Sequence, residues 1–237
     1  MPFNRFVLGL GVFIFLLLSV VALVYFKERA LLLDNAFQIF LMISDERIEI
    51  MAQRWPAAIH RVLPYVLMLF GASLPILAKG FSISYILWQL ILFLVIVHRF
   101  RNPWLGLLQL AVLLLATSDG FFWCNSEQVL GLSMVILLLA VFQADDLGKV
   151  RRFVLLTAVG LVVLFTHPLL ILPLIFVLVC DQVLEGHFKI EKNIFLIVFT
   201  FLWYLKRALI PNWYDRMKGR DFENNLEFYL HQWWEIP

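Results

Sequence analysis

Long runs of apolar residues without a charged side chain dominate this chain. Windows that contain no Asp, Glu, Lys or Arg cover 6–26, 62–78, 80–97, 102–118, 128–143, 153–180 and 193–205. A helix rises about 1.5 Å per residue, so roughly 20 apolar residues cross the hydrocarbon core of a bilayer. Several windows reach that length, and shorter ones can tilt or lie re-entrant. The pattern predicts an all-α fold, a polytopic transmembrane helical bundle with about 6–8 membrane segments.

Two of these windows depart from a simple span. Window 62–78 contains Pro64, Gly71 and Pro75, which predicts a short and irregular segment. Window 153–180 is too long for one untilted span, and it is interrupted by the sequence Thr-His-Pro at 166–168. Because a proline disfavours helix in the residue before it, we expect two short helices that meet at this turn.

Composition supports the membrane class. Hydrophobic residues make up 62% of the chain and charged residues 15%, whereas soluble domains have about 45–50% and about 25%. The net charge of +2 is too small to indicate a nucleic-acid partner, and we expect none. Cys124 and Cys180 lie in or beside apolar windows, so we expect them to pack in the core rather than form a disulfide or metal site.

The distribution of Lys and Arg predicts an orientation. Arg5 precedes window 6–26, which lacks a small-x-small cleavage site, so we expect an uncleaved signal anchor in the plasma (inner) membrane with a cytoplasmic N-terminus. If 62–78 is re-entrant or interfacial, the cations of the short loops all lie inside: Arg99, Arg101, Lys149, Arg151, Arg152, Lys189 and Lys192. The turns at 119–127 and 166–168 then lie outside. The alternative is a fully spanning 62–78 with the N-terminus outside.

This orientation defines the expected domains. Residues 1–210 form the transmembrane domain, within which 27–61 is an amphipathic extracytoplasmic loop, and 211–237 form a polar-aromatic tail. The chain ends abruptly within an amphipathic segment. We therefore expect it to be the N-terminal portion of a longer protein.

The first loop holds the main catalytic candidate. Asp34, Gln38, Asp45 and Glu49 are spaced four, seven and four apart, which places them along one stripe of a helix over 31–51. The opposing apolar surface consists of Leu33, Phe37, Phe40, Leu41 and Ile48. One interpretation is a plain solvated face on an interfacial helix. The other makes Asp34 a general base that deprotonates an acceptor hydroxyl beside a lipid-borne substrate.

Arg47, Arg54 and Arg61 recur at seven-residue intervals, which stacks them along a helix wherever the helix persists. Pro56 is expected to bend that stripe between the second and third arginine. Planar guanidinium groups at a membrane surface suit phosphate. A substrate phosphate and ordinary lipid head groups satisfy them equally well.

The segment 118–127 is the second candidate, since it places Asp119 and Glu127 against charge-free helices. A carboxylate there costs free energy unless it is paired or near water. Glu127 also falls in the first turn of a helix, where the dipole favours an anion, so capping is its alternative role. His167 is expected on the same side, either in the site or as a hydrogen-bonded turn residue.

Several function classes lack their motifs. The chain has no Walker A sequence, no Gly-rich dinucleotide loop, no HExxH and no Cys/His metal set. No cofactor is therefore assigned, although a divalent metal stays possible in principle. Transporters usually place charges within spans, and here the span interiors carry none. That distribution favours a reaction or binding event at the membrane surface over transport through the bilayer.

The order of these features resembles the start of the GT-C glycosyltransferases, polytopic enzymes that use polyprenyl-phosphate-linked sugars. The resemblance covers most of the chain in layout: one span, a loop with an early Asp, an aromatic turn before Glu127, and the turn at 166–168. It implies that Asp34 is the catalytic acid of the first loop and that Glu127 and His167 line the same cavity. Asp34 is followed by Asn35, where the family has a second acidic residue. Further spans and a C-terminal soluble domain are also missing.

The leading hypothesis is therefore a GT-C-like transferase that takes a sugar from a lipid-phosphate donor at the extracytoplasmic face. Asp34 is its expected catalytic residue, and the expected substrate-binding residues are Arg47, Arg54, Asp119, Glu127 and His167. The first alternative is a non-catalytic membrane subunit that binds a partner or lipid. The second is a small transporter.

Overall fold

The computed structural model describes residues 2–115, 121–124, 126–144, 146–186, 189–210 and 212–232, and over these residues its regular elements are all helices. The longer helices of the bundle are α1 (Pro2–Val24), α5 (Leu74–Leu94), α6 (Pro103–Leu115), α7 (Glu127–Phe142), α8 (Lys149–Thr166), α9 (Ile171–Glu185) and α10 (Ile190–Leu209). The shorter elements are α2 (Phe26–Ala30), α3 (Leu33–Ser44), α4 (Val62–Leu69), the 3-10 turns η1 (Met51–Gln53), η2 (Trp55–Arg61) and η4 (Pro168–Leu170), and the π turn η3 (Val95–Arg99). Helix α11 (Trp213–Gln232) forms most of the tail. The predicted all-α class is confirmed.

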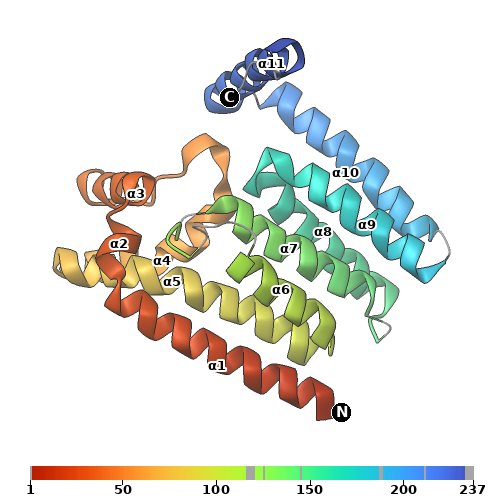
Figure 1. Ribbon diagram of the computed structural model, residues 1–237, viewed down its shortest axis with the longest axis horizontal. Helices are drawn as coiled ribbons and strands as arrows, with labels where there is room; N and C mark the ends of the chain where they lie inside the picture. Colours follow the sequence, from red (N-terminus) through yellow and green to blue (C-terminus); the bar gives the residue numbers. More distant parts are fainter. Residues whose placement is uncertain are drawn as a thin grey trace.

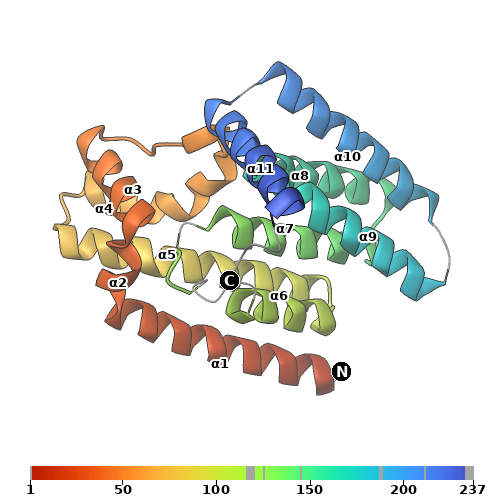
Figure 2. The same ribbon diagram turned by 45° about the horizontal axis from the view of Figure 1, so that its top comes forward.

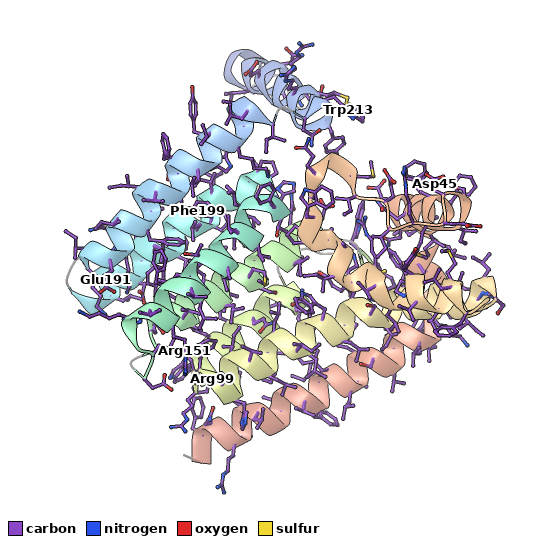
Figure 3. All side chains as sticks on the ribbon, turned by 180° about the vertical axis from the view of Figure 1, so that it is seen from behind. Asp45, Arg99, Arg151, Glu191, Phe199 and Trp213 are labelled. Atoms are coloured by element: carbon purple, nitrogen blue, oxygen red, sulfur yellow. The ribbon has the colours of Figure 1, made fainter. Side chains whose placement is uncertain are left out.

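Successive long helices run in opposite directions (Figure 1), and most successive pairs pack together, whereas α9 packs on α7 and α10 rather than on α8. This arrangement gives the bundle two ends. The end that carries α2, α3, the 3-10 turns, the start of α7 and α11 is called the loop end here (Figures 1 and 2). The opposite end carries Arg99 and Arg151, far from Asp45 and Trp213 of the loop end (Figure 3). Arg99 pairs with Asp146 and Arg152 with Glu191, so the short connections that carry Lys and Arg meet at this end.

Helix α7 lies at the centre, and its side chains from Val129 to Val141 are nearly all buried. The outer helices show the reverse pattern, because α1 and α10 turn large apolar side chains such as Phe13 and Phe201 outward, each more than half exposed. A water-soluble bundle places polar residues on that outer face. Among the described residues, two helices, Phe3–Val24 and Leu74–Arg99, are long and apolar enough to cross a bilayer.

The region around window 62–78 is partly as predicted. Helix α4 has only eight residues, so this segment is short and irregular as expected. The windows 62–78 and 80–97, which Lys79 separates, do not match the helices, because α5 begins at Leu74 after a turn with Gly71 at φ 72°. Lys79 lies on the exposed face of α5, with Nζ 5.1 Å from the centre of the Phe26 ring. A charged residue on a helix surface need not end the helix.

The turn at 166–168 separates α8 from α9, so the predicted division of window 153–180 is confirmed. Two side chains of α10 hold this turn. Trp203 Nε1 donates to the Pro168 carbonyl at 3.0 Å, and Lys206 Nζ donates to the Leu164 carbonyl at 2.8 Å.

The predicted helix over 31–51 is too long. Helix α3 ends at Ser44, and Glu46 then takes a left-handed conformation with φ 51°. The carboxylate stripe is lost as a result, since Gln38 is buried while Asp34 is exposed and Glu49 lies beyond the helix. The outward face of α3 includes Phe37 and Phe40, two side chains of the predicted apolar surface.

Candidate functional site

Two arginines converge on one carboxylate at the loop end. Arg54 Nη1 donates to Glu127 Oε2, and Arg61 Nη2 lies 3.9 Å from Glu127 Oε1. The side chains of Arg54, Arg61 and Glu127 are 11%, 4% and 13% exposed. Because little water surrounds these side chains, the attraction between the two arginines and Glu127 is strong, and the nearby Glu49 also acts on the charge of Arg61. These three residues are called the arginine–glutamate cluster below.

Local backbone geometry places both arginines. Ala52 and Gln53 take left-handed conformations, with φ of 53° and 57°, and turn the chain before Arg54. Pro56 then occupies the first turn of η2, where its missing N–H costs nothing. Arg61, at the end of η2, also donates from Nη1 to the Glu49 carbonyl at 2.6 Å. The predicted seven-residue arginine stripe is therefore wrong, because the helix breaks before Arg54.

Glu127 occupies the first turn of α7. The Ser126 hydroxyl caps that helix by accepting from the Val129 N–H at 3.4 Å. The position of Glu127 near the positive end of the helix dipole also favours its ionised form. Its ion pair with Arg54 adds a second role that capping alone does not explain.

Arg29 anchors the chain segment that leads to Glu127. This side chain is fully buried, and its guanidinium donates to Ser82 Oγ at 2.8 Å, to the Ser82 carbonyl at 3.2 Å and to the Phe121 carbonyl. Its Cζ also lies 3.9 Å from the centre of the Phe121 ring. Burial lowers the pKa of Arg29, and the nearby Cys124 thiol opposes that effect. The fork of Arg29 thus joins α2, α5 and segment 121–124.

Asn35 and Cys124 complete this junction. Asn35 Nδ2 donates to the Arg29 carbonyl and to the Phe122 carbonyl, the latter at 3.2 Å. Cys124 Sγ donates to the same Arg29 carbonyl at 3.0 Å. Burial raises the pKa of the Cys124 thiol to about 11, so it stays protonated at neutral pH. The thiol therefore packs and donates, and it is a poor nucleophile.

His60 lies under the cluster, fully buried between two rings. Its ring centre is 5.8 Å from that of Tyr85 and 6.2 Å from that of Phe81, both in edge contacts. Neither ring nitrogen has a hydrogen-bond partner in the described part of the chain. Burial, followed by the charge of Arg61, lowers the pKa of His60 well below its usual value, so the imidazole is neutral. Burial also lowers the pKa of Arg61 to about 10, which leaves it charged at pH 7.

An apolar groove runs beside the cluster. It has a volume of about 370 Å³ and lies between the η2–α4 segment and α5. The groove is lined by Ile59, Val62, Leu63, Val66, Ser84, Leu87, Trp88 and Ile91. Val62 directly follows Arg61, so the groove adjoins the backbone segment that carries one of the two arginines.

The structure brings only some of the predicted site residues together. Arg54 and Glu127 form the cluster, whereas Arg47 is 65% exposed and pairs with Asp45 and Glu49 at 3.6 and 3.0 Å. Asp34 is exposed in the first turn of α3, and it lies outside the cluster.

The other two predicted site residues are His167 and Asp119. His167 acts as a turn residue, since its Nδ1 accepts from the Leu169 N–H at 3.2 Å. Asp119 lies outside the described residues.

The C-terminal helix covers part of the site. Helix α11 packs on η1, and the ring centre of Tyr214 lies 5.2 Å from Arg54 Cζ. Figure 2 shows α11 crossing the loop end. The predicted polar-aromatic tail is thus a helix that contributes an aromatic ring to the cluster.

Sequence reasoning missed a second group of buried polar residues. In the middle of the bundle, Gln109 Nε2 donates to the Gln89 carbonyl at 3.0 Å, and the Ser133 hydroxyl donates to Gln89 Oε1 at 2.7 Å. All three side chains are fully buried. These residues are uncharged, so an inspection of charged positions does not find them. Their isolated positions within apolar windows were the only indication in the sequence.

Neither a search for metal-binding groups nor comparison with known proteins adds a residue to the candidate site. Among the described residues, no group of three or more His, Cys, Asp or Glu side chains could hold a metal ion. Comparisons with models of protein families, with curated proteins and with solved structures give no match for this chain.

Proposed function

We propose that the chain is an integral membrane protein in which α1 and α5 to α10 cross the bilayer. Their alternating directions, their apolar outer faces and the two helices of full spanning length support this proposal. The shorter helices are accommodated by tilt or local thinning. The grouping of loop cations at the end opposite the loop end supports a cytoplasmic N-terminus in the plasma (inner) membrane.

We further propose that the loop end binds a lipid-linked phosphate and that the chain acts as a GT-C-like glycosyltransferase on a polyprenyl-phosphate sugar donor. The observation that carries the proposal is the position of the arginine–glutamate cluster beside the apolar groove. The planar forks of Arg54 and Arg61 suit phosphate oxygens. Glu127 holds both guanidinium groups in place before the ligand binds. The groove takes the first part of the lipid chain.

Asp34 is the proposed base for the acceptor hydroxyl. It is an exposed carboxylate at the loop end, and its neighbour Asn35 is bonded to the segment that precedes Glu127. This hydrogen bond holds α3 at a fixed position relative to the cluster. Arg47 pairs with carboxylates of its own loop and has at most a peripheral role in this proposal.

Binding of a polyprenyl phosphate to the purified chain in nanodiscs tests the phosphate site. Arg61→Gln is expected to weaken binding by about tenfold or more, because a buried charge-assisted contact is lost. Arg47→Gln is the matched control and should bind as the parent chain does. Equal affinity in all three proteins would sink the proposed phosphate site. Loss of sugar transfer in Asp34→Asn, with binding retained, would identify the base.

A non-catalytic lipid-binding subunit is the second candidate. The observation in its favour is that Asp34 lies outside the cluster while the cluster carboxylate is already paired with arginine. This candidate predicts the same loss of lipid binding in Arg61→Gln. It also predicts that Asp34→Asn changes no activity of any complex that co-purifies with the chain.

A further inference from the structure

Cations gather at the end of the bundle opposite the loop end. The Lys and Arg residues there are Arg5, Arg99, Arg101, Lys149, Arg151, Arg152, Lys189 and Lys192. Contacts join the segments that carry them: Phe3 and Trp104 rings lie 4.9 Å apart, and Arg99 pairs with Asp146 at 3.2 Å. This surface is called the basic end below. Figure 3 shows Arg99 and Arg151 on it.

Carboxylates neutralise only part of this charge. The acidic side chains that the structure describes at this end are Asp146, Asp181 and Glu191. Asp146 pairs with Arg99, Glu191 lies 3.7 Å from Arg152, and Asp181 pairs with the buried Lys192. Arg101, Lys149 and Arg151 are exposed around them. Counted over the side chains that the structure describes, the basic end therefore presents a net positive surface.

Helix α8 adds to the positive potential. Lys149, Arg151 and Arg152 occupy its first turn, which contains no acidic residue. The N-terminus of a helix already carries a partial positive charge, so cations there repel it. An anionic partner held against this surface would offset the repulsion.

Apolar side chains alternate with these cations, and they decide the class of partner. Val150 stands between Lys149 and Arg151 and is 79% exposed, while Phe153 and Trp104 are about equally exposed at 70% and 69%. A nucleic acid or an acidic protein presents no apolar layer against which the exposed apolar groups beside each cation could be buried. A bilayer surface does, because it offers anionic head groups next to an apolar layer.

We propose that the basic end binds the anionic head groups of one membrane leaflet, with Arg101, Lys149 and Arg151 as principal contacts. Trp104, Val150 and Phe153 enter the adjoining acyl layer. Each cation near an anionic surface contributes roughly 1 kcal/mol, or about fivefold in association. The inference rests on the membrane insertion proposed above, and it is independent of the sugar-transfer reaction.

Reconstitution of the full chain in vesicles of equal parts phosphatidylglycerol and phosphatidylcholine tests this inference. The lipid that stays bound after mild detergent extraction is quantified, and we expect phosphatidylglycerol to be enriched several-fold over the bulk. Arg101→Gln, Lys149→Gln and Arg151→Gln together should abolish the enrichment. A matched variant with Lys27→Gln, Lys79→Gln and Arg216→Gln removes three exposed cations at the loop end and should keep it.

The outcomes separate the two proposals. No enrichment in the parent chain, or equal loss in both triple variants, would overturn the lipid inference while leaving membrane insertion in place. Release of the chain from vesicles by alkaline carbonate would instead contradict the insertion itself. All substituted side chains are exposed, and helical circular dichroism checks that both variants fold.

Discussion

The guanidinium of Arg29 donates a hydrogen bond to the carbonyl of Phe121, which lies 92 positions further along the chain. This contact joins the first loop to the turn before α7. Through this contact, α2 and α5 fix the position of the segment that precedes Glu127. They therefore also fix the position of the carboxylate that pairs with Arg54 and Arg61.

Arg29→Met is expected to destabilise the chain strongly. The substitution leaves the buried carbonyls of Ser82 and Phe121 without their guanidinium donor, at about 1–3 kcal/mol for each group. Arg29→Lys should rescue little, because one ammonium cannot span the three acceptors that the fork reaches. Thermal unfolding in detergent, followed by tryptophan fluorescence, measures both. A melting temperature unchanged in Arg29→Met would contradict the anchoring role.

His60 makes stability depend on pH. Its pKa in the folded chain is lowered well below the unfolded value of about 6.5. The unfolded chain therefore binds more protons below that pH, so stability is complete above about pH 6.5 and falls as the pH drops toward the folded pKa. His60→Phe should remove this dependence and fit the aromatic surroundings. Melting temperatures at pH 7.5 and pH 5.5 would converge in the variant, and an unchanged difference would point to other groups.

The two cysteines should react at different rates. Cys124 is fully buried, with its thiol pKa raised to about 11, whereas Cys180 is partly exposed. Because Cys124 is enclosed by the fold and Cys180 is partly exposed on α9, a small membrane-permeant maleimide applied to the detergent-extracted chain should modify Cys180 first and Cys124 only after unfolding. Mass spectrometry of peptides from the native protein checks this order. Cys180→Ser gives the control, since it should leave the native chain almost unlabelled.

Gln89→Leu should loosen the middle of the bundle. The substitution removes the acceptor of the Ser133 hydroxyl and one acceptor of Gln109 Nε2. Hydrogen bonds between membrane helices contribute about 0.6 kcal/mol on average, so a modest fall in melting temperature is expected. Gln89→Leu combined with Ser133→Ala and Gln109→Leu should recover part of it, because no buried polar partner is then left over. A triple variant less stable than the single one would contradict this account.

The helices themselves were largely predictable, and so was the break at 166–168. Apolar windows and proline positions act over a few residues, which is the range that a sequence pattern reports. The predicted helix ends were wrong where they were inferred from the positions of charged residues. Lys79 continues α5 because its side chain reaches outward along the helix surface, and α3 stops at Ser44 well before the charge pattern ends.

The candidate site was predictable only in part. Arg54 and Glu127 were both chosen from the sequence, but the reason offered for Arg54 was a helical stripe with Arg47 that does not exist. Arg54 meets Glu127 across 73 positions of sequence, through a turn with two left-handed residues. Arg29 and Gln89 were not noticed, since nothing local distinguishes a buried polar side chain from an exposed one.

By itself the amino-acid sequence determined that this is a helical chain with apolar outer surfaces, and where most of its helices run. Those properties follow from hydrophobicity and backbone sterics, which act residue by residue. Only the tertiary structure decided which polar groups meet. Burial requires each charge and hydrogen-bonding group to find a partner, and that partner can lie anywhere along the chain that packing brings within reach.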